Sequence, residues 1–212
     1  VNNIEFFIQK IKHKLKPEGK VLISAPECTR QIFEGDWNLL TQQHISYFTQ
    51  SGLIQMFYFF NFSVESIFQT NDEIFILFKL MNDLEKTGKL TIANKVNLNL
   101  FLNHLENKLK SFDYLIKDIY QRNMLLVAHG ASSGILNLVA NSKYYEELTK
   151  NLIILDSDPS KHGKYLTFFQ IPITSPENLK IIPNLVLIGS STFEKSIREF
   201  WRNSNNCEFW SV

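Results

Sequence analysis

Short apolar runs alternate with helical stretches from Met124 to the end of the chain, and this alternation constrains the fold more than any other feature. Strands that alternate with helices are connected by right-handed crossovers, so we expect a parallel sheet covered by helices. The predicted strands lie at residues 124–128, 152–155, 171–173 and 185–188, and the predicted helices cover 135–140, a segment that starts at Ser175-Pro176, and 194–201.

The first eighty residues form a second α/β region, which opens in the middle of such an alternation. Residues 4–15 carry apolar side chains at helical spacing and run into Lys16-Pro17-Glu18-Gly19, which predicts a helix followed by a turn. The wholly apolar run Val21-Leu22-Ile23 is typical of a strand buried in a parallel sheet. The other predicted elements are a helix from its N-cap Thr49 to about Phe60, and strands at 63–69 and 73–80 joined by a hairpin turn.

These patterns divide the chain into three parts: a first lobe at residues 1–80, a polar link and long helix at 81–123, and a small Rossmann-like parallel-sheet domain at 124–212. Apolar side chains recur at heptad-like spacing between Leu98 and Ile119. They indicate a helix that packs between the lobes, with a coiled-coil homodimer as the alternative. Residues 27–43 are irregular and polar, and a loop of that length is usually functional.

Composition excludes several classes of protein. The net charge is +1, from 22 basic and 21 acidic residues with no basic stripe, so we expect no nucleic-acid partner. Cys28 and Cys207 form no CxxC pattern, which argues against a disulfide framework or a cysteine-rich zinc site. We expect a cytoplasmic protein with no membrane partner, because no apolar run reaches membrane-spanning length and residues 1–10 lack signal-peptide features. Phenylalanines cluster between Phe57 and Phe78, which predicts a buried strand and helix face there, with an exposed patch as the alternative.

A glycine turn between a predicted strand and helix is the first candidate binding site. In Gly130-Ala131-Ser132-Ser133-Gly134 the glycines permit a close backbone approach, and the N–H groups at the helix start favour an anion. Asp156 and Asp158 follow the next strand, where an acid contacts ribose in dinucleotide-binding folds. The alternative is that the turn serves helix–strand packing alone, since a full G-x-G-x-x-G is absent.

His44 is the candidate catalytic base, since it ends the irregular loop just before a capped helix. The other histidines show no metal-ligand spacing with one another, so we predict no metal site. The sequence contains neither a G-x-S-x-G elbow nor a G-K-[ST] phosphate loop, which disfavours an α/β-hydrolase and a P-loop NTPase.

Two stretches of the first lobe resemble class I S-adenosylmethionine methyltransferases. Leu15-Lys16-Pro17-Glu18-Gly19-Lys20-Val21-Leu22-Ile23 resembles the helix end, turn and fifth strand of that fold, and the hairpin up to Leu80 resembles its sixth and seventh strands. Gln43-His44-Ile45-Ser46-Tyr47-Phe48-Thr49 resembles the EHxSYFS motif of the sugar C-methyltransferases.

The second lobe resembles the C-terminal domain of the same family, in order and spacing. The matching segments are Gly130-Ala131 with Leu136-Asn137, Leu155-Asp156-Ser157-Asp158-Pro159-Ser160-Lys161-His162-Gly163-Lys164-Tyr165-Leu166, and Ile171-Pro172-Ile173-Thr174-Ser175-Pro176-Glu177-Asn178-Leu179.

The resemblance implies an enzyme that methylates a carbon of a nucleotide-linked keto sugar, with S-adenosylmethionine as the donor. A base removes a proton beside the keto group, and the resulting enolate attacks the donor's methyl group. His44 matches that base, and Tyr47 also belongs to the motif. The implied substrate-binding residues are Gln43, Gly130, Ser132, Ser133, Asn137, Asp156, Lys161 and Tyr165.

The sequence departs from the family pattern in ways that keep two alternatives open. Gln43 replaces the motif glutamate and Thr41 the tyrosine three residues before His44, and the donor-binding glycine-rich turn has no counterpart in the first lobe. We therefore expect that this chain alone does not bind the donor in the usual way. One alternative is a non-catalytic module that binds a nucleotide-linked sugar. The other is an NAD(P)-dependent oxidoreductase, because Gly130–Ile135 resembles the GASSGIG turn of short-chain dehydrogenases, although no Y-x-x-x-K follows.

Overall fold

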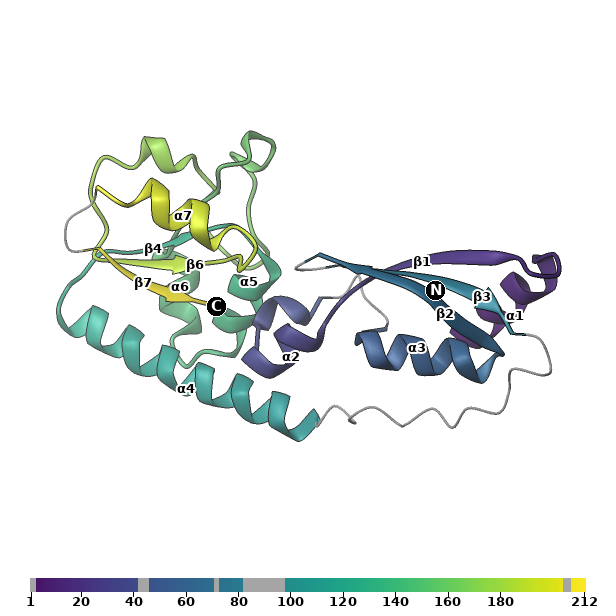
Figure 1. Cartoon of the computed structure of the whole chain (residues 1–212). Coiled ribbons are helices and arrows are strands. Elements are labelled where there is room, and N and C mark those ends of the chain that lie inside the picture. Colours follow the sequence, from purple (N-terminus) through teal and green to yellow (C-terminus); the bar gives the residue numbers. More distant parts are fainter. Residues whose placement is uncertain (1–2, 42–45, 71–72, 82–97, 204–206) are drawn as a thin grey trace. The chain divides into compact units, whose positions relative to one another are not determined.

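The computed structural model describes residues 3–41, 46–70, 73–81, 98–203 and 207–212, and it divides the chain into two compact units. Unit 1 comprises Val1–Ile32 and Gln42–Leu98, and unit 2 comprises Phe33–Thr41 and Asn99–Val212. The predicted mixed α/β class is confirmed, since unit 2 contains a four-stranded parallel sheet of Rossmann-like type (Figure 1). In the described part of the chain, no helix is long and apolar enough to cross a membrane.

Unit 1 packs two helices against one face of a three-stranded antiparallel sheet. The Asn3 side chain caps the first helix, and Thr49 Oγ1 accepts a hydrogen bond of 3.1 Å from the Gly52 N–H, which confirms the predicted N-cap. The strand order is β1-β3-β2, so the second strand of the hairpin lies between the other two. The elements are α1 (Ile4–Lys14), β1 (Lys20–Pro26), α3 (Gln50–Phe59), β2 (Phe62–Gln69) and β3 (Glu73–Leu80).

The prediction that Val21-Leu22-Ile23 forms a strand buried in a parallel sheet is wrong. These residues belong to β1, an edge strand that pairs antiparallel with β3, and the Leu22 side chain is 63% exposed. A run of three apolar residues does not encode which strand lies beside it. The neighbour is set instead by the hairpin, whose second strand pairs with β1 along its whole length.

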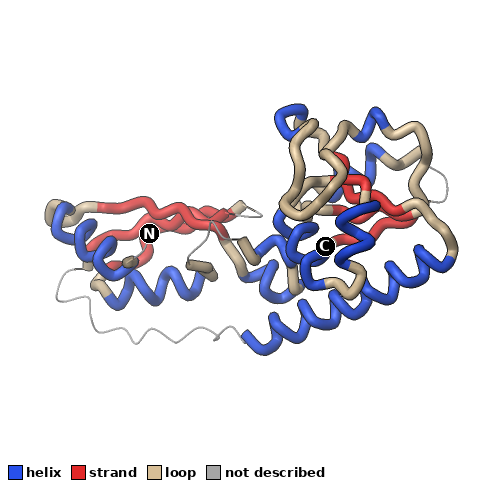
Figure 2. Tube along the Cα trace, turned by 180° about the vertical axis from the view of Figure 1, so that it is seen from behind, coloured by secondary structure: helices blue, strands red, loops and turns tan. Residues whose placement is uncertain are grey.

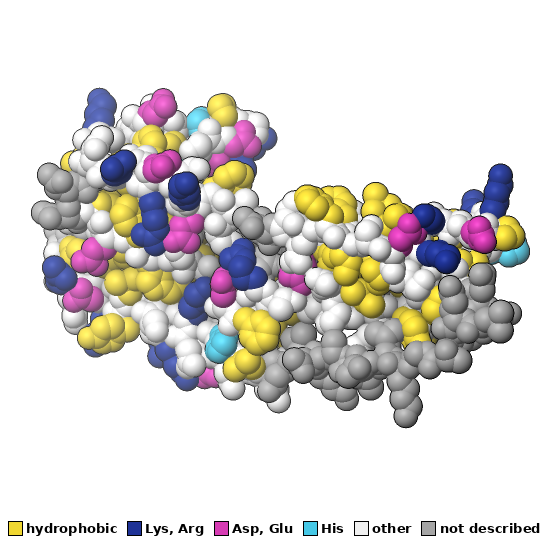
Figure 3. Space-filling view, in the orientation of Figure 1, with side chains coloured by type: hydrophobic (Ala, Val, Ile, Leu, Met, Phe, Trp, Pro, Cys, Tyr) yellow, Lys and Arg dark blue, Asp and Glu magenta, His cyan; other side chains and the backbone are white. Residues whose placement is uncertain are grey.

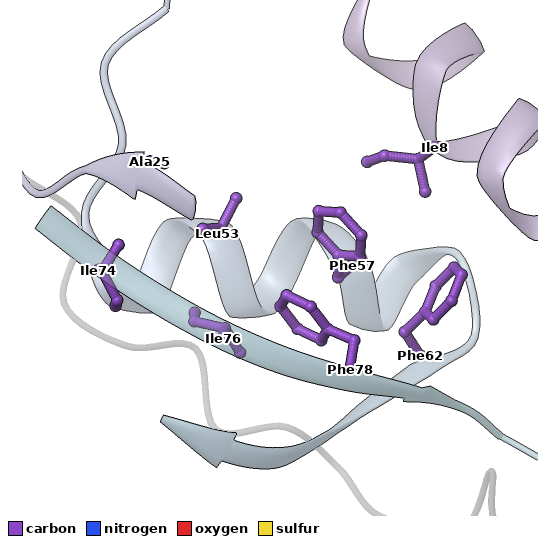
Figure 4. Packing of buried hydrophobic residues seen from close by; sticks show 8 residues of the cluster. All are labelled: Ile8, Ala25, Leu53, Phe57, Phe62, Ile74, Ile76 and Phe78. Atoms are coloured by element: carbon purple, nitrogen blue, oxygen red, sulfur yellow. The ribbon is translucent and has the colours of Figure 1, made fainter. Parts of the chain in front are cut away.

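Stacked phenylalanines form the centre of unit 1 (Figure 4). The rings of Phe57 on α3 and Phe78 on β3 are 4.2 Å apart and nearly parallel, and the Phe62 ring packs edge-on against Phe57. The predicted buried face is therefore present, but Phe59 and Phe68 from the same cluster are largely exposed. Figure 3 shows hydrophobic side chains gathered on the surface over the strands of unit 1.

Unit 2 contains the parallel sheet, with strand order β5-β4-β6-β7. A single bridge between Leu155 and Thr174 adds one more parallel contact outside β5, so the order in chain terms reads 3-2-1-4-5. A full Rossmann sheet has the strand order 3-2-1-4-5-6, so this order matches its first five strands. The strands are β4 (Leu126–His129), β5 (Ile153–Leu155), β6 (Leu185–Ile188) and β7 (Glu208–Ser211).

Helices cover both faces of this sheet (Figures 1 and 2). On one face, Ile197 and Trp201 of the α7 region pack on Val127 and Val186. On the other face, Phe112 of α4 contacts Trp210 of β7, with ring centres 5.5 Å apart. The helices are α4 (Leu98–Gln121), α5 (Ser133–Asn141), α6 (Tyr145–Asn151) and α7 (Glu194–Phe200).

Several predicted boundaries differ from the structure. The long helix α4 belongs to unit 2, because its buried face, including Leu105 and Ile116, forms part of that unit's core. The strand predicted at 171–173 is reduced to the one bridge at Thr174, and the helix predicted after Ser175 is the short 3₁₀ turn Pro176–Asn178. Residues 27–43, predicted to be irregular, contain the helix α2 (Thr29–Glu34) and the 3₁₀ helix η1 (Trp37–Leu39).

The stacked core of unit 1 predicts a clear contrast between two phenylalanines of the same helix. Phe57→Ala removes a fully buried ring and should cost about 3–5 kcal/mol of unfolding free energy. Phe59→Ala is the matched control, because that ring is 82% exposed, and it should change stability by less than about 0.5 kcal/mol. Urea unfolding followed by circular dichroism measures both variants, and equal losses would contradict the packing described.

Candidate functional site

A cavity of about 560 Å³ opens at the carboxyl ends of the strands of unit 2. It lies where β4 and β6, which are neighbours in the sheet, send their chains to helices on opposite faces, the usual ligand position in open α/β sheets. Its walls are His129, Gly130, Ala131, Ser132, Asp156, Ser157, Asp158, Lys161, Ser190, Phe193, Ser196, Ile197 and Phe200.

The floor of the cavity depends on two glycines that approach backbone to backbone. Gly130 has φ +99°, a conformation that favours glycine, and it follows β4. A Cβ atom on Gly189, which follows β6, would lie 1.9 Å from the Gly130 carbonyl oxygen. The two turns can approach this closely only because both residues at the contact are glycines.

Most N–H groups of the glycine turn already have acceptors inside unit 2. Ala131 N–H donates to Asp156 Oδ2 at 2.8 Å, and Gly134 N–H donates to Asn38 Oδ1 of η1 at 2.9 Å. Ile135 N–H is capped by Ser132 Oγ, whose hydroxyl donates in turn to the Gly189 carbonyl. This arrangement favours the packing role of the turn over the predicted role as an anion cradle.

Asp156 is buried directly after β5 and accepts three hydrogen bonds. Its partners are the Ala131 N–H, the Asp158 N–H at 2.9 Å and Lys161 Nζ at 2.8 Å. Burial raises the pKa of this carboxyl, but the Lys161 hydrogen bond and the two N–H groups outweigh it and hold the pKa below its ordinary value. Asp156 is thus a charged anchor, and the protein already uses three of the roughly four acceptor positions of its carboxylate.

Lys161 brings a positive charge to the cavity wall. It ends the 3₁₀ helix η3 (Pro159–Lys161), whose first turn is capped by the Asp158 carboxylate through the Ser160 N–H at 2.9 Å. Its ammonium donates to Asp156 and, at 3.3 Å, to the Ala131 carbonyl. An ammonium has three donors, and the described residues accept from two of them, which leaves one for a ligand at this wall.

His129 ends β4 and is buried, with hydrogen bonds on both ring nitrogens. Its Nδ1 lies 3.0 Å from Trp201 Nε1, and its Nε2 lies 3.1 Å from Ser157 Oγ. Burial lowers the pKa of this imidazole, and the nearby Asp156 charge opposes that effect only in part. The imidazole is therefore held neutral. No role in a site was predicted for His129 from the sequence, because nothing in the local pattern connects it to Trp201.

Two aromatic rings stand at the cavity wall and were not predicted as site residues. Phe193 precedes α7 and Phe200 is its last residue, and their side chains are 63% and 45% exposed despite their apolar character. Exposed rings at a cavity offer flat surfaces on which a planar group can stack. The sequence shows that these two phenylalanines are seven residues, or two helical turns, apart and so share one side of a helix. It does not show that this side faces a cavity.

The structure brings some predicted residues together and places others elsewhere. Gly130, Ser132, Asp156 and Lys161 line the cavity. Ser133 begins α5 outside its wall, and Tyr165 is exposed outside it as well. Asn137 also stands apart, because its amide donates to the carbonyls of Trp37 and Leu40 and so fixes η1 on α5.

The predicted catalytic residues belong to unit 1. His44 and Gln43 lie outside the described residues, and Tyr47 is partly exposed. The segment after Tyr47 is anchored to the end of β1: the Cys28 N–H donates to the Phe48 carbonyl at 2.9 Å, and the buried Glu27 carboxylate accepts the Gln50 N–H at 3.3 Å. Sequence reasoning did not anticipate Glu27, which holds the end of the motif beside the strand.

Among residues with described positions, no three His, Cys, Asp or Glu side chains gather as metal ligands would. Fold and site together define a mixed α/β protein whose second unit is Rossmann-like, with a polar and aromatic cavity at the carboxyl ends of its strands. No protein-family model matches the sequence, and no curated protein matches it closely enough to count as a relative.

Two buried groups of the site predict how stability changes with pH. His129 has a folded pKa below the unfolded value of about 6.5, so it binds fewer protons when folded, and its contribution is lost as pH falls below about 6.5. Asp156 also has a lowered pKa, so its contribution persists above its unfolded value of about 3.9 and is lost at more acidic pH.

We therefore expect the unfolding free energy of unit 2 to decrease between pH 7.5 and 5.5, and to decrease again below about pH 4. Tryptophan fluorescence reports this unit, because all three tryptophans lie in it. In His129→Asn, which keeps an acceptor for Trp201 without the titrating ring, the loss between pH 7.5 and 5.5 should shrink. A decrease of the same size in that variant would contradict the assignment to His129.

Proposed function

We propose that unit 2 binds a nucleotide-linked sugar, as the acceptor-holding lobe of an S-adenosylmethionine-dependent sugar C-methyltransferase. The observation that carries this proposal is the cavity at the carboxyl ends of β4, β5 and β6. Its volume lies within the range of small-ligand sites, and its wall includes charged, hydroxyl and aromatic side chains.

These groups match the parts of such a ligand. The spare donor of Lys161 suits a phosphoryl oxygen, because an ammonium beside a phosphate gains both charge attraction and a hydrogen bond. The exposed rings of Phe193 and Phe200 suit a nucleobase, since stacking on an aromatic ring does not depend on the base. The hydroxyls of Ser190 and Ser196 suit the polar edges of a sugar.

Unit 1 supports the methyltransferase part of the proposal through its strand order. The resemblance matches β1 to the fifth strand of that fold and the hairpin of β2 and β3 to its last two strands. In the proposed reaction, His44 removes the proton beside the keto group of the sugar. Glu27 and Phe48 hold the end of the motif at the carboxyl end of β1.

The described residues do not fit the methyl donor itself. A donor site of this kind needs a free acid for the ribose and free N–H groups in a glycine turn. In unit 2, Asp156 already accepts from Ala131 N–H and Lys161, and Gly134 N–H already donates to Asn38. In the described part of unit 1 the glycines are Gly19, in the turn before β1, and Gly52, within α3.

This mismatch favours a second candidate function, a binding module that keeps the sugar-nucleotide cavity without the chemistry. The paired state of Asp156 also weighs against the oxidoreductase alternative, because a nicotinamide dinucleotide needs an acid at this position that is free for its ribose hydroxyls.

Calorimetric titration with UDP-glucose and dTDP-glucose tests the binding proposal. We expect one of them to bind, and Lys161→Met to weaken that binding about tenfold or more, because a charge-assisted hydrogen bond to phosphate is lost. Lys164→Met is the matched control, since Lys164 is exposed and lies off the cavity wall, and its affinity should be unchanged. If neither ligand binds, the proposal is overturned, and binding of NADH instead would support the oxidoreductase.

Proton exchange separates the enzyme from the binding module without any methyl donor. In D₂O, the chain should accelerate deuterium incorporation at the carbon beside the keto group of a nucleotide-linked keto sugar, as followed by proton NMR. His44→Asn should reduce that acceleration by about 10²–10⁴-fold, the usual contribution of a positioned base. Binding of the keto sugar with no accelerated exchange would assign the chain to the non-catalytic module.

A further inference from the structure

A chain of three hydrogen-bonded side chains runs from the interior of unit 2 to the cavity wall. It begins at Trp201, which follows α7, passes through His129 at the end of β4, and reaches Ser157 after β5. Trp201 and His129 are 6% and 2% exposed, whereas Ser157 is exposed on the cavity wall. The chain therefore connects a buried donor with a hydroxyl that a ligand can reach.

The chemistry of the indole determines where each proton lies. Trp201 Nε1–H is a donor only, so His129 Nδ1 must be the acceptor of the 3.0 Å bond. A neutral imidazole then carries its proton on Nε2, and that N–H donates to Ser157 Oγ at 3.1 Å. Burial keeps the ring neutral and so maintains this tautomer.

The same assignment excludes a serine nucleophile activated by His129. A general base must accept the serine proton, but the acceptor nitrogen of His129 faces Trp201, and the nitrogen that faces Ser157 already carries a proton. The contact between His129 and Ser157 consequently orients the hydroxyl and does not deprotonate it.

A hydroxyl oriented in this way favours a ligand that places a hydrogen-bond acceptor next to it. Because Ser157 Oγ accepts from His129, its own O–H is directed to another acceptor, and the hydrogen bonds of the described residues provide none. Lys161 lies on the same wall, four residues further along the chain, with a donor to spare. A cation and a neutral donor that line one cavity match a phosphate group, whose oxygens accept from both.

We propose that Ser157 donates a hydrogen bond to a phosphoryl oxygen of the nucleotide-linked ligand, and that His129 and Trp201 are positioning residues that hold its hydroxyl in the donating orientation. This assignment rests on the proposed function of the cavity. It adds a phosphate contact that the sequence pattern did not indicate, in a place where the glycine turn has few free N–H groups.

Calorimetry with UDP and dTDP, each compared with its nucleoside, tests the assignment. Ser157→Ala should lower the affinity for the diphosphate about tenfold and leave that for the nucleoside unchanged. Ser157→Thr retains the hydroxyl and should restore diphosphate affinity to within about twofold. Ser160→Ala is the control, because Ser160 is exposed on the same segment but lies off the cavity wall.

The positioning role has its own measurement. Nitrogen-15 NMR of the histidine ring should show His129 protonated on Nε2 and unprotonated on Nδ1 at pH 7. Trp201→Phe removes the indole donor, so the ring should populate both tautomers and the diphosphate affinity should fall while nucleoside affinity does not. If Trp201→Phe fails to fold, the NMR of the unaltered chain and the Ser157 variants still decide the proposal.

The possible failures are distinguishable. If the unaltered chain binds neither diphosphate, the proposed function is overturned and the assignment of Ser157 with it. If the unaltered chain binds UDP or dTDP and Ser157→Ala binds it equally well, or if His129 carries its proton on Nδ1, the role of Ser157 is overturned and the cavity's proposed function stands.

Discussion

The site of unit 2 depends on the hydrogen bonds that the buried carboxylate of Asp156 accepts. It accepts from the turn after β4 through Ala131, from its own turn through Asp158, and from Lys161 at the cavity wall. A charge removed from water is costly unless it is paired and hydrogen-bonded, so this carboxylate constrains all three segments at once. The cavity floor, the position of Lys161 and the entry into α5 follow from that constraint.

His129 complements Asp156 in a different way. Both groups are polar and buried at the carboxyl ends of neighbouring strands, but Asp156 is held charged whereas His129 is held neutral. The reason is the chemistry of their partners: a lysine and two N–H groups stabilise the anion, and an indole N–H together with burial disfavours the imidazolium. A ligand that enters the cavity thus meets groups whose protonation is already set, which lowers the reorganisation that binding requires.

Elements with a strong local pattern could be predicted from the sequence. The residues of β6 and β3 were assigned at their observed bounds, and Thr49 caps α3 as its position before an apolar run indicated. Where local pattern was weak, prediction failed: α6 and β7 were missed, and the edge position of β1 was not anticipated. Strand order depends on which surfaces pack together, and a short apolar run carries no information on its neighbour.

By itself, the sequence determined the mixed α/β class and the presence of a glycine turn, an acid and a lysine after neighbouring strands, because periodicity and turn chemistry act over a few residues. The tertiary structure alone decided what these residues do. Asp156 turned out to be an internal anchor, Asn137 a support for η1, and His129 a link between Trp201 and Ser157, which lie 72 residues after it and 28 residues after it in the chain. Such contacts arise from the register of parallel strands and the helices packed on them, and no local pattern specifies which distant side chains that register brings together.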